Sequence, residues 1–214
     1  IEPEEELPND FEYELPEIEE ELEIPKFEEH SVIEEEKIVQ AENITEGRPI
    51  LGVLPLKLKK AGIITTGSEV FHGRIKDSFT PVVKEKLLAV GIEVTKHIML
   101  DDGMDNIVDA IDEMRTSGVD VIICTGGMSV DPDDNTPGAI KKAGADIVTY
   151  GAPVLPGAMF LLAYYTKDDG SVVTIMGLPG CVMYAKRTIF DLVLPRILAG
   201  DILTEEDLNI LGEG

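Results

Sequence analysis

The chain has 214 residues, of which 43% are hydrophobic, so it is long enough to bury a sizeable core in one main domain with an appendage. Its formal net charge of -24 excludes duplex nucleic acid and anionic membranes as main partners, because both bind through clustered Lys and Arg. Cys124 and Cys181 form no CxxC pair, which predicts free thiols in a reducing compartment, the cytoplasm.

The first 50 residues are strongly acidic, with 19 acidic and 3 basic side chains, a net charge of -16. Residues 11–15 (FEYEL) and 21–24 (ELEI) alternate apolar side chains with Glu, which permits short strands, but prolines interrupt this stretch repeatedly. Residues 31–44 carry apolar side chains at helical spacing and predict a short helix. Two interpretations stay open for this arm: an acidic linker that orders only against something else, or an interaction arm for a basic partner.

Strands and helices alternate through the rest of the chain. Strands are predicted at 61–65, 92–100, 119–125 and 146–150, and a hairpin at 160–177 with its turn at 167–170. Helices are predicted after the first three strands, at about 77–90, 101–118 and 136–143, and again at 182–198. This order predicts an α/β fold with a mostly parallel sheet covered on both faces. The domains are predicted as an acidic N-terminal arm with a short helix at 1–56 and an α/β domain at 57–214.

Four loops follow the carboxyl ends of predicted strands, where open parallel sheets bind ligands. The residues that they bring together are Thr66, Gly67, Ser68 and Glu69, then Asp101 and Asp102, then Thr125, Gly126, Gly127, Met128 and Ser129 through Asp134, and finally Gly177, Leu178, Pro179 and Gly180. Glycine amides with carboxylates and few cations make a poor site for a bare phosphate. They make a good one for a phosphate bridged to Mg²⁺, which takes carboxylate and phosphate oxygens.

Four motifs carry a resemblance to a known family. They are TTGSEVFHGRIKDS (65–78), TGGMSVDPDD (125–134), VLPG (154–157) and GLPG (177–180). In their order and spacing, from about Leu58 to Gly200, the chain resembles the molybdenum cofactor biosynthesis domain shared by molybdopterin adenylyltransferases, molybdopterin molybdotransferases and gephyrin. The resemblance implies a three-layer α/β/α sandwich that binds molybdopterin or adenylated molybdopterin, with molybdate as a further partner, in a homo-oligomer, dimer or trimer.

The resemblance also assigns roles to residues. Asp134 stands at the position of the family's glycine-loop aspartate, linked to metal or nucleotide handling, and Asp101 or Asp102 at that of a functional carboxylate. These three are the candidate catalytic residues, with Asp134 and Asp101 as Mg²⁺ ligands. Gly126, Gly127 and Ser129 belong to the phosphate-contacting loop. The remaining matched positions are candidate ligand contacts: Glu69, Asp77, Ser78, Pro156 and Gly157.

The chain departs from the family pattern at several positions. Ser68 replaces the Asp of TGDE, Phe79 replaces the Asn after Asp-Ser, and Cys181-Val182 replaces Asn-Pro after GLPG. Leu155 and Ala158 replace the two lysines of KPGKP, and the loss of two cations weakens electrostatic stabilisation of a transferring group.

Three functions remain open. The first is a molybdotransferase-like enzyme that inserts molybdate into molybdopterin or its adenylate with Mg²⁺. The second is a non-catalytic molybdopterin carrier or sensor, which the lost lysines favour. The third is a nucleotide pyrophosphatase of the competence-damage type. Each aspartate also has a purely structural interpretation, because Asp131, Asp133 and Asp134 fit an ordinary polar loop and Asp101 or Asp102 fits a helix cap.

Overall fold

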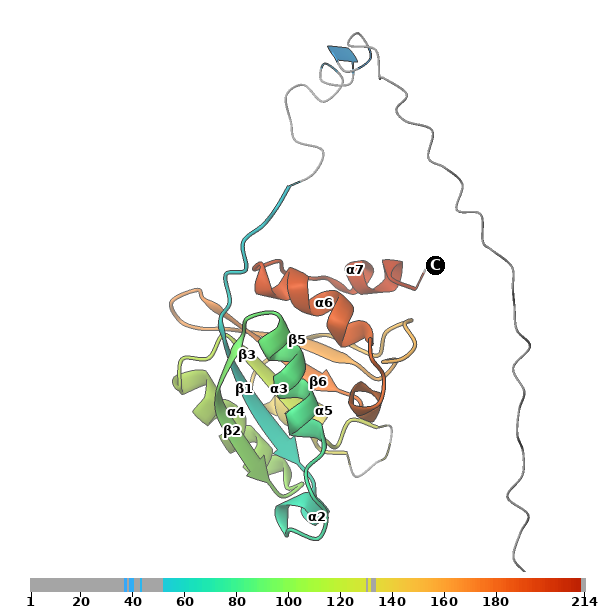
Figure 1. The fold of residues 1–214 in the computed structure, drawn as a ribbon. Helices are drawn as coiled ribbons and strands as arrows, with labels where there is room; N and C mark the ends of the chain where they lie inside the picture. The colour runs from blue at the N-terminus through green and yellow to red at the C-terminus, as the bar shows by residue number, and fades with distance from the viewer. Residues whose placement is uncertain are drawn as a thin grey trace, which may run out of the picture. The chain divides into compact units, whose positions relative to one another are not determined.

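The computed structural model divides into two units, Ile1–Gly52 and Val53–Gly214. It describes Lys37, Val39, Gln40, Asn43 and residues 52–129, 131 and 134–212. In the first unit Lys37, Val39, Gln40 and Asn43 are helical and fall within the predicted short helix, whereas Gly52 is not helical. The strands considered for 11–15 and 21–24 lie outside the described residues. The second unit carries the fold described below (Figure 1).

A six-stranded mixed sheet forms the centre of the second unit, in the order β2-β1-β3-β6-β5-β4. Its strands are β1 (Lys60–Thr66), β2 (Glu93–Leu100), β3 (Val121–Thr125), β4 (Asp146–Tyr150), β5 (Leu161–Thr166) and β6 (Val172–Leu178). The pairs β1–β2, β1–β3 and β3–β6 are parallel, and β5 runs antiparallel to both of its neighbours. The prediction of a mostly parallel sheet with one hairpin is confirmed.

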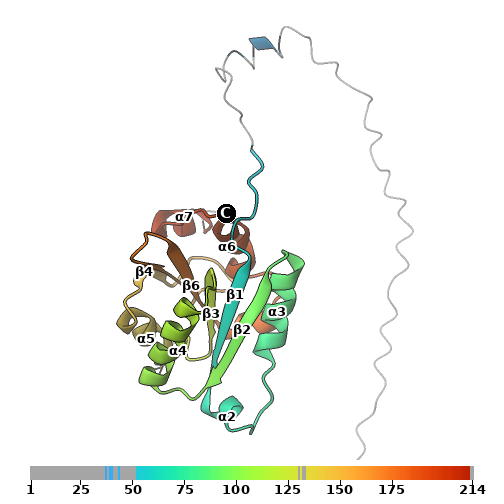
Figure 2. The same cartoon turned by 90° about the vertical axis from the view of Figure 1, so that its left-hand side faces the viewer.

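Helices cover both faces of this sheet. On one face, α3 (Phe79–Ala89) and α6 (Ile189–Leu198) share a core cluster with Ile63 of β1. On the other face, α4 (Met104–Thr116) and α5 (Thr136–Lys142) pack against Ile64. Figure 2 shows α4 and α5 on the side of the sheet away from α3. The predicted three-layer sandwich is therefore confirmed.

The central strand β3 explains why the sheet could be recognised from the sequence. All five of its residues, Val121–Thr125, are buried, because helices cover the sheet above and below them. A continuous apolar run of this length between turn residues is typical of such a strand. The edge strand β2 is instead exposed or only partly buried at every residue except Leu100.

The predicted helix at 182–198 is wrong in its first part. A 3₁₀ turn, η1 (Gly180–Met183), comes first, and α6 begins only at Ile189. Thr188 and Asp191 form a capping box in which the Thr188 amide donates to Asp191 Oδ2 at 2.8 Å, and this box sets the helix start. Two short helices, α2 (Ser68–Phe71) and α7 (Glu205–Ile210), were not predicted, because they are too short to show periodicity. No helix in the described part of the chain is long and apolar enough to span a bilayer.

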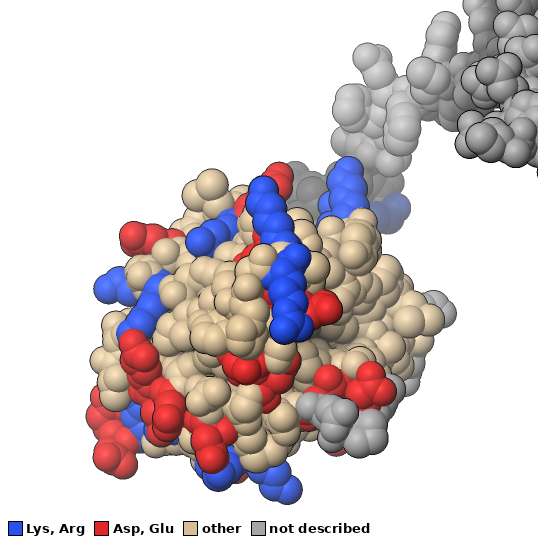
Figure 3. All heavy atoms as spheres, turned by 90° about the horizontal axis from the view of Figure 1, so that it is seen from below, with Lys and Arg blue, Asp and Glu red and all other residues tan. Residues whose placement is uncertain are grey.

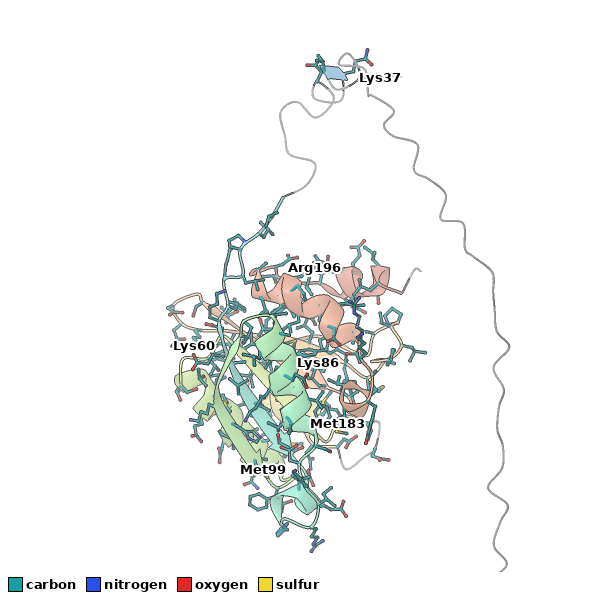
Figure 4. All side chains as sticks on the ribbon, in the orientation of Figure 1. Lys37, Lys60, Lys86, Met99, Met183 and Arg196 are labelled. Carbon is teal, nitrogen blue, oxygen red and sulfur yellow. The ribbon has the colours of Figure 1, made fainter. Side chains whose placement is uncertain are left out.

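An ion pair joins α3 to α6 on one face of the sheet. Lys86 Nζ lies 2.7 Å from Asp191 Oδ1, and it also donates to the Lys186 carbonyl at 2.9 Å. Figure 4 labels Lys86 on α3. Both charged side chains are largely buried, with 15% and 21% of their surface exposed. Since Asp191 also closes the capping box, this single carboxylate fixes both the start of α6 and its place beside α3.

The C-terminal helix α7 provides a prediction for acid stability. Hydrogen bonds from Thr204 and the nearby Arg196 lower the pKa of Asp207 from 3.8 to about 2. Because the folded-state pKa is depressed, the stabilisation from this group is complete above about pH 4 and is lost as the pH falls towards 2. We expect the unfolding free energy of Asp207→Asn, measured by urea titration, to fall less steeply with decreasing pH in this range than that of the unaltered chain. An unchanged slope would contradict the assignment.

The two cysteines are both free, as predicted, and they differ in environment. Cys124 in β3 is fully buried, and burial raises the pKa of its thiol to about 12. Cys181 in η1 is partly exposed. We expect a thiol reagent at pH 8 to modify Cys181 alone in the native protein and both cysteines after unfolding, as measured by mass spectrometry. Rapid native labelling of Cys124 would show that β3 opens readily.

Candidate functional site

Four loops leave the sheet at one edge. They follow Thr66 of β1, Leu100 of β2, Thr125 of β3 and Leu178 of β6, and they share an edge because these four strands are parallel. This convergence was predicted from the sequence. Figure 3 views the molecule from the α2 side and shows acidic and basic side chains on this face.

The loop after β3 has a backbone conformation that only glycine adopts without strain. Gly126 and Gly127 have φ angles of 89° and 55°. A Cβ on Gly126 would lie 2.3 Å from the carbonyl oxygen of Thr66, so the end of β1 also leaves no room for a side chain. The loop is therefore fixed by both its own geometry and its neighbour strand.

Hydrogen bonds hold two carbonyls of this glycine loop (126–129), whereas its amides have no acceptor among the described residues. The Thr136 hydroxyl donates to the Gly126 carbonyl at 2.9 Å, and the Tyr150 hydroxyl donates to the Ser129 carbonyl at 2.7 Å. Among the described residues, none accepts a hydrogen bond from the backbone N–H groups of residues 126–129. Successive amides without an internal partner form a site suited to phosphate oxygens.

A cavity of about 330 Å³ lies beside the glycine loop, on the α4 and α5 side of the sheet. Its lining comes from three of the loops and from the helices behind them: Thr66, Asp102, Ile107, Gly127, Asp131, Asp134, Asn135 and Thr136. Three of these described lining residues are aspartates and none is Lys or Arg. A bare phosphate would be repelled here, whereas a phosphate that carries a divalent cation would be attracted.

Hydrogen bonds tie the first three loops together around Asp102. The Ser68 amide donates to Asp102 Oδ2 at 2.8 Å, and the Asn135 side-chain amide donates to the Asp102 carbonyl at 2.9 Å. The Ser68 hydroxyl donates to Asp101, and this bond lowers the pKa of the Asp101 carboxyl. Asp101 is absent from the described lining of the cavity, so its carboxylate supports the loop while Asp102 faces the cavity.

The helix-cap interpretation of these two aspartates is wrong. Gly103 is the N-cap residue of α4, and no side chain caps the helix. The carboxylates of Asp101 and Asp102 instead accept hydrogen bonds from Ser68, which lies in α2. Ser68 stands where the family pattern has Asp, so in this chain a hydrogen-bond donor takes the place of a further carboxylate.

One carboxylate oxygen of Asp134 is hydrogen bonded within the loop. Its Oδ2 accepts hydrogen bonds from the Ser129 hydroxyl at 2.7 Å and the Asp131 amide at 3.3 Å. No described residue donates to the other oxygen. In the described part of the chain, no group of three or more acidic, His or Cys side chains could hold a metal by itself. Mg²⁺ usually binds one or two carboxylates together with phosphate oxygens and water, so an ion beside Asp102 and Asp134 would need further oxygen ligands from a bound phosphate and from water.

Other predicted contact residues lie away from this cavity. Asp77 Oδ1 accepts hydrogen bonds from the Phe79 and Thr80 amides at 2.9 and 3.0 Å, so it binds the first two amides of α3, whose N-cap residue is Ser78, on the opposite face of the sheet. The Ser78 hydroxyl contacts the sulfur of Met183 in η1. Glu69 is exposed on α2 and follows Gly67, the N-cap residue of that helix.

Several candidates belong to the packed core or to the start of α6. Leu178 is buried, and Met128 packs so closely on Gly177 that a Cβ there would lie 2.5 Å from its Cε. Gly180 opens η1 directly after Pro179. The Pro156 carbonyl accepts a hydrogen bond from the Ile189 amide at 3.2 Å, and a Cβ on Gly157 would lie 2.6 Å from Ile189. These residues position loops at the carboxyl edge, and their role as ligand contacts stays a prediction.

Asn135, Thr136 and Tyr150 were missed by sequence reasoning although each contacts the glycine loop or its neighbour. Thr136 had a signal, because it directly precedes Pro137 at a helix start. The sequence around Asn135 and Tyr150 carries no such signal, because their hydrogen-bond partners lie on other loops.

Comparison with known proteins assigns the family. A family model described as "Probable molybdopterin binding domain" matches residues 62–199. The chain belongs to this molybdopterin-binding domain family. A molybdopterin molybdenumtransferase of Synechococcus elongatus is 27% identical over 138 residues, which cover 60% of this chain and 34% of that protein. A CinA-like protein of Desulfosudis oleivorans is 37% identical over 83 residues, or 39% of this chain and 20% of that protein. The chain thus spans a fifth to a third of these curated relatives.

Solved structures support the same fold. The tungsten cofactor synthesizing protein MoaB of Pyrococcus furiosus superposes with a TM-score of 0.55 at 20% identity, covering 68% of this chain and 98% of MoaB. The molybdopterin biosynthesis enzyme MoaB of Thermus thermophilus gives a TM-score of 0.52 at 20% identity, over 67% and 98% of the two chains. At this identity the likeness shows the fold alone.

Proposed function

We propose that this chain binds molybdopterin or adenylated molybdopterin at the carboxyl edge of the sheet and inserts molybdate into it, as a molybdotransferase-like enzyme of the cytoplasm. The observation that carries the proposal is the acidic cavity beside glycine-loop amides that have no acceptor among the described residues. Membership of the molybdopterin-binding domain family supports the pterin as ligand.

Each part of the cavity has a task in this proposal. The amides of residues 126–129 donate to the phosphate oxygens of the ligand. The carboxylates of Asp102 and Asp134 provide oxygen ligands for Mg²⁺, which, when bound, neutralises charge on the phosphate. Ser68 and Asn135 hold Asp102 in place, so they are positioning residues. The contribution of the protein is to orient the bound groups and to preorganise charge around them.

A second candidate function is a carrier or sensor that binds molybdopterin without turnover. Leu155 and Ala158 stand where related insertases have lysines, and Leu155 is 85% exposed in the loop before β5. A loop without these cations offers molybdate or a leaving phosphate less attraction. Binding through the glycine loop and the aspartates would persist without them.

A third candidate function is nucleotide pyrophosphate hydrolysis. It is favoured by the relative from Desulfosudis oleivorans, which is named a CinA-like protein and is 37% identical over the matched 83 residues. The same amides and carboxylates would then hold a dinucleotide pyrophosphate with its metal.

Titration calorimetry separates these functions. The protein is titrated with molybdopterin and with its adenylate, each with and without Mg²⁺, and molybdate is added to the bound complex. Mg²⁺-dependent binding followed by release of AMP and formation of molybdenum cofactor is the expected result. Tight binding without turnover would identify the carrier, and absence of pterin binding with cleavage of a dinucleotide would identify the pyrophosphatase.

A further inference from the structure

Tyr150 stands at the carboxyl edge, close to the glycine loop. It is the last residue of β4, and β4 runs in the same direction as β6 because both are antiparallel to β5. Its neighbour in the sheet is Leu161, the first residue of β5. The side chain therefore leaves the sheet at the same edge as the four loops that follow β1, β2, β3 and β6.

A hydrogen bond anchors the tip of this side chain to the glycine loop. The Tyr150 hydroxyl donates to the Ser129 carbonyl at 2.7 Å, and the Ser129 hydroxyl donates in turn to Asp134 at 2.7 Å. Burial raises the pKa of Tyr150, and the charge of Asp134 raises it further, so the phenol keeps its proton and remains a donor. The ring is thus held at a fixed place next to Ser129, the last residue of the glycine loop.

Tyr150 nevertheless has 39% of its residue surface exposed. A tyrosine whose only task was to pin the loop would need its hydroxyl alone, and its ring would be expected to pack into the core. Among the described residues, Tyr150 is the aromatic side chain that hydrogen bonds to the glycine loop, whereas the exposed Phe71 and Tyr184 make no such bond. Tyr150 is therefore partly open to solvent at a fixed place beside the glycine loop.

We propose that Tyr150 is a ligand-binding residue, whose ring stacks against the planar heterocycle of a phosphorylated ligand held by the glycine loop. This inference rests on the proposed function for the phosphate. The ring that stacks is the pterin or the adenine, which share a flat aromatic face. Aromatic side chains that stack on such rings contribute strongly to affinity and tolerate different bases, because every base has such a face.

A pair of matched ligands tests the ring separately from the phosphate. AMP and ribose 5-phosphate carry the same phosphate and sugar, and they differ by the adenine. Calorimetric affinities with Mg²⁺ are compared for the unaltered chain, Tyr150→Phe and Tyr150→Ala. Tyr150→Phe removes the hydroxyl and keeps the ring, while Tyr150→Ala removes both. Circular dichroism checks the fold, and Tyr150→Leu replaces the alanine variant if that chain does not fold.

The expected result is that affinity for AMP falls in the variant that lacks the ring and persists in the variant that keeps it. AMP should bind more tightly than ribose 5-phosphate to the unaltered chain and to Tyr150→Phe. In Tyr150→Ala the affinity for AMP should fall about tenfold further than the affinity for ribose 5-phosphate. A pterin phosphate in place of AMP identifies which heterocycle stacks, because the larger loss marks the natural one.

Two results would overturn the inference while leaving the proposed function intact. Equal losses of affinity for AMP, the pterin phosphate and ribose 5-phosphate in Tyr150→Ala would show that the ring makes no stacking contact. Equal effects of Tyr150→Phe and Tyr150→Ala would show that the side chain only pins the loop. If no phosphate binds the unaltered chain, the proposed phosphate site itself is wrong, and this inference falls with it.

Discussion

Replacing Gly126 with alanine is expected to lower the free energy of unfolding by about 3 kcal/mol. The φ angle of 89° places this residue in the left-handed region, which costs a residue with a Cβ roughly 1–2 kcal/mol. The new methyl group would also lie 2.3 Å from the Thr66 carbonyl oxygen, and relieving such a contact costs about 1–3 kcal/mol more. Denaturant titration of the variant measures the sum.

Gly118→Ala is the matched control for this prediction. Gly118 has a similar φ angle of 78°, and nothing lies within 4 Å of the Cβ that alanine would add. Its substitution should therefore cost only the backbone part, about 1 kcal/mol. Equal destabilisation of the two variants would mean that the end of β1 can move away from the added methyl group and does not confine the glycine loop.

The fold could be predicted because its signals are local and repeated. Buried apolar runs such as 121–125 mark central strands, and the hairpin turn at 167–170 separates β5 from β6. Once the strands are known to be parallel, the carboxyl ends and their loops must share an edge. The prediction failed at the start of the last long helix, because the stretch from Val182 onwards resembles one helix, whereas the capping box at Thr188 makes α6 begin only at Ile189.

The candidate site was predictable only in part, because its contacts join distant segments. Nothing near Asp102 in the sequence indicates that Ser68 and Asn135 hold it, and each is more than 30 residues away. Asp134 was singled out by the motif resemblance, and the structure adds that Ser129 orients one of its oxygens. Tyr150 is an ordinary strand residue in the sequence, and β6 and β5 separate its strand from β3 in the sheet, so the strand order does not indicate its contact with Ser129.

Asp134→Asn is expected to remove the Mg²⁺ dependence of ligand binding while leaving the fold intact. With Mg²⁺ present, affinity for adenylated molybdopterin should fall at least tenfold, because a carboxylate ligand of the ion is lost. Without Mg²⁺ the variant should bind slightly more tightly than the unaltered chain, since one charge that repels phosphate is gone. The asparagine carbonyl can still accept the Ser129 hydroxyl, so the melting temperature should change little.

Asp146→Asn controls for the loss of one negative charge. Asp146 is exposed at the first residue of β4, so it lies at the opposite edge of the sheet from Tyr150. Its substitution should leave affinity unchanged both with and without Mg²⁺. For Asp134→Asn, affinity is expected to fall with Mg²⁺ and to rise slightly without it. A change in net charge alone would shift both affinities in the same direction, so this pattern distinguishes metal binding from general electrostatics. Unaltered calorimetric affinity of Asp134→Asn in Mg²⁺ would remove this aspartate from the metal site and leave Asp102 as its carboxylate.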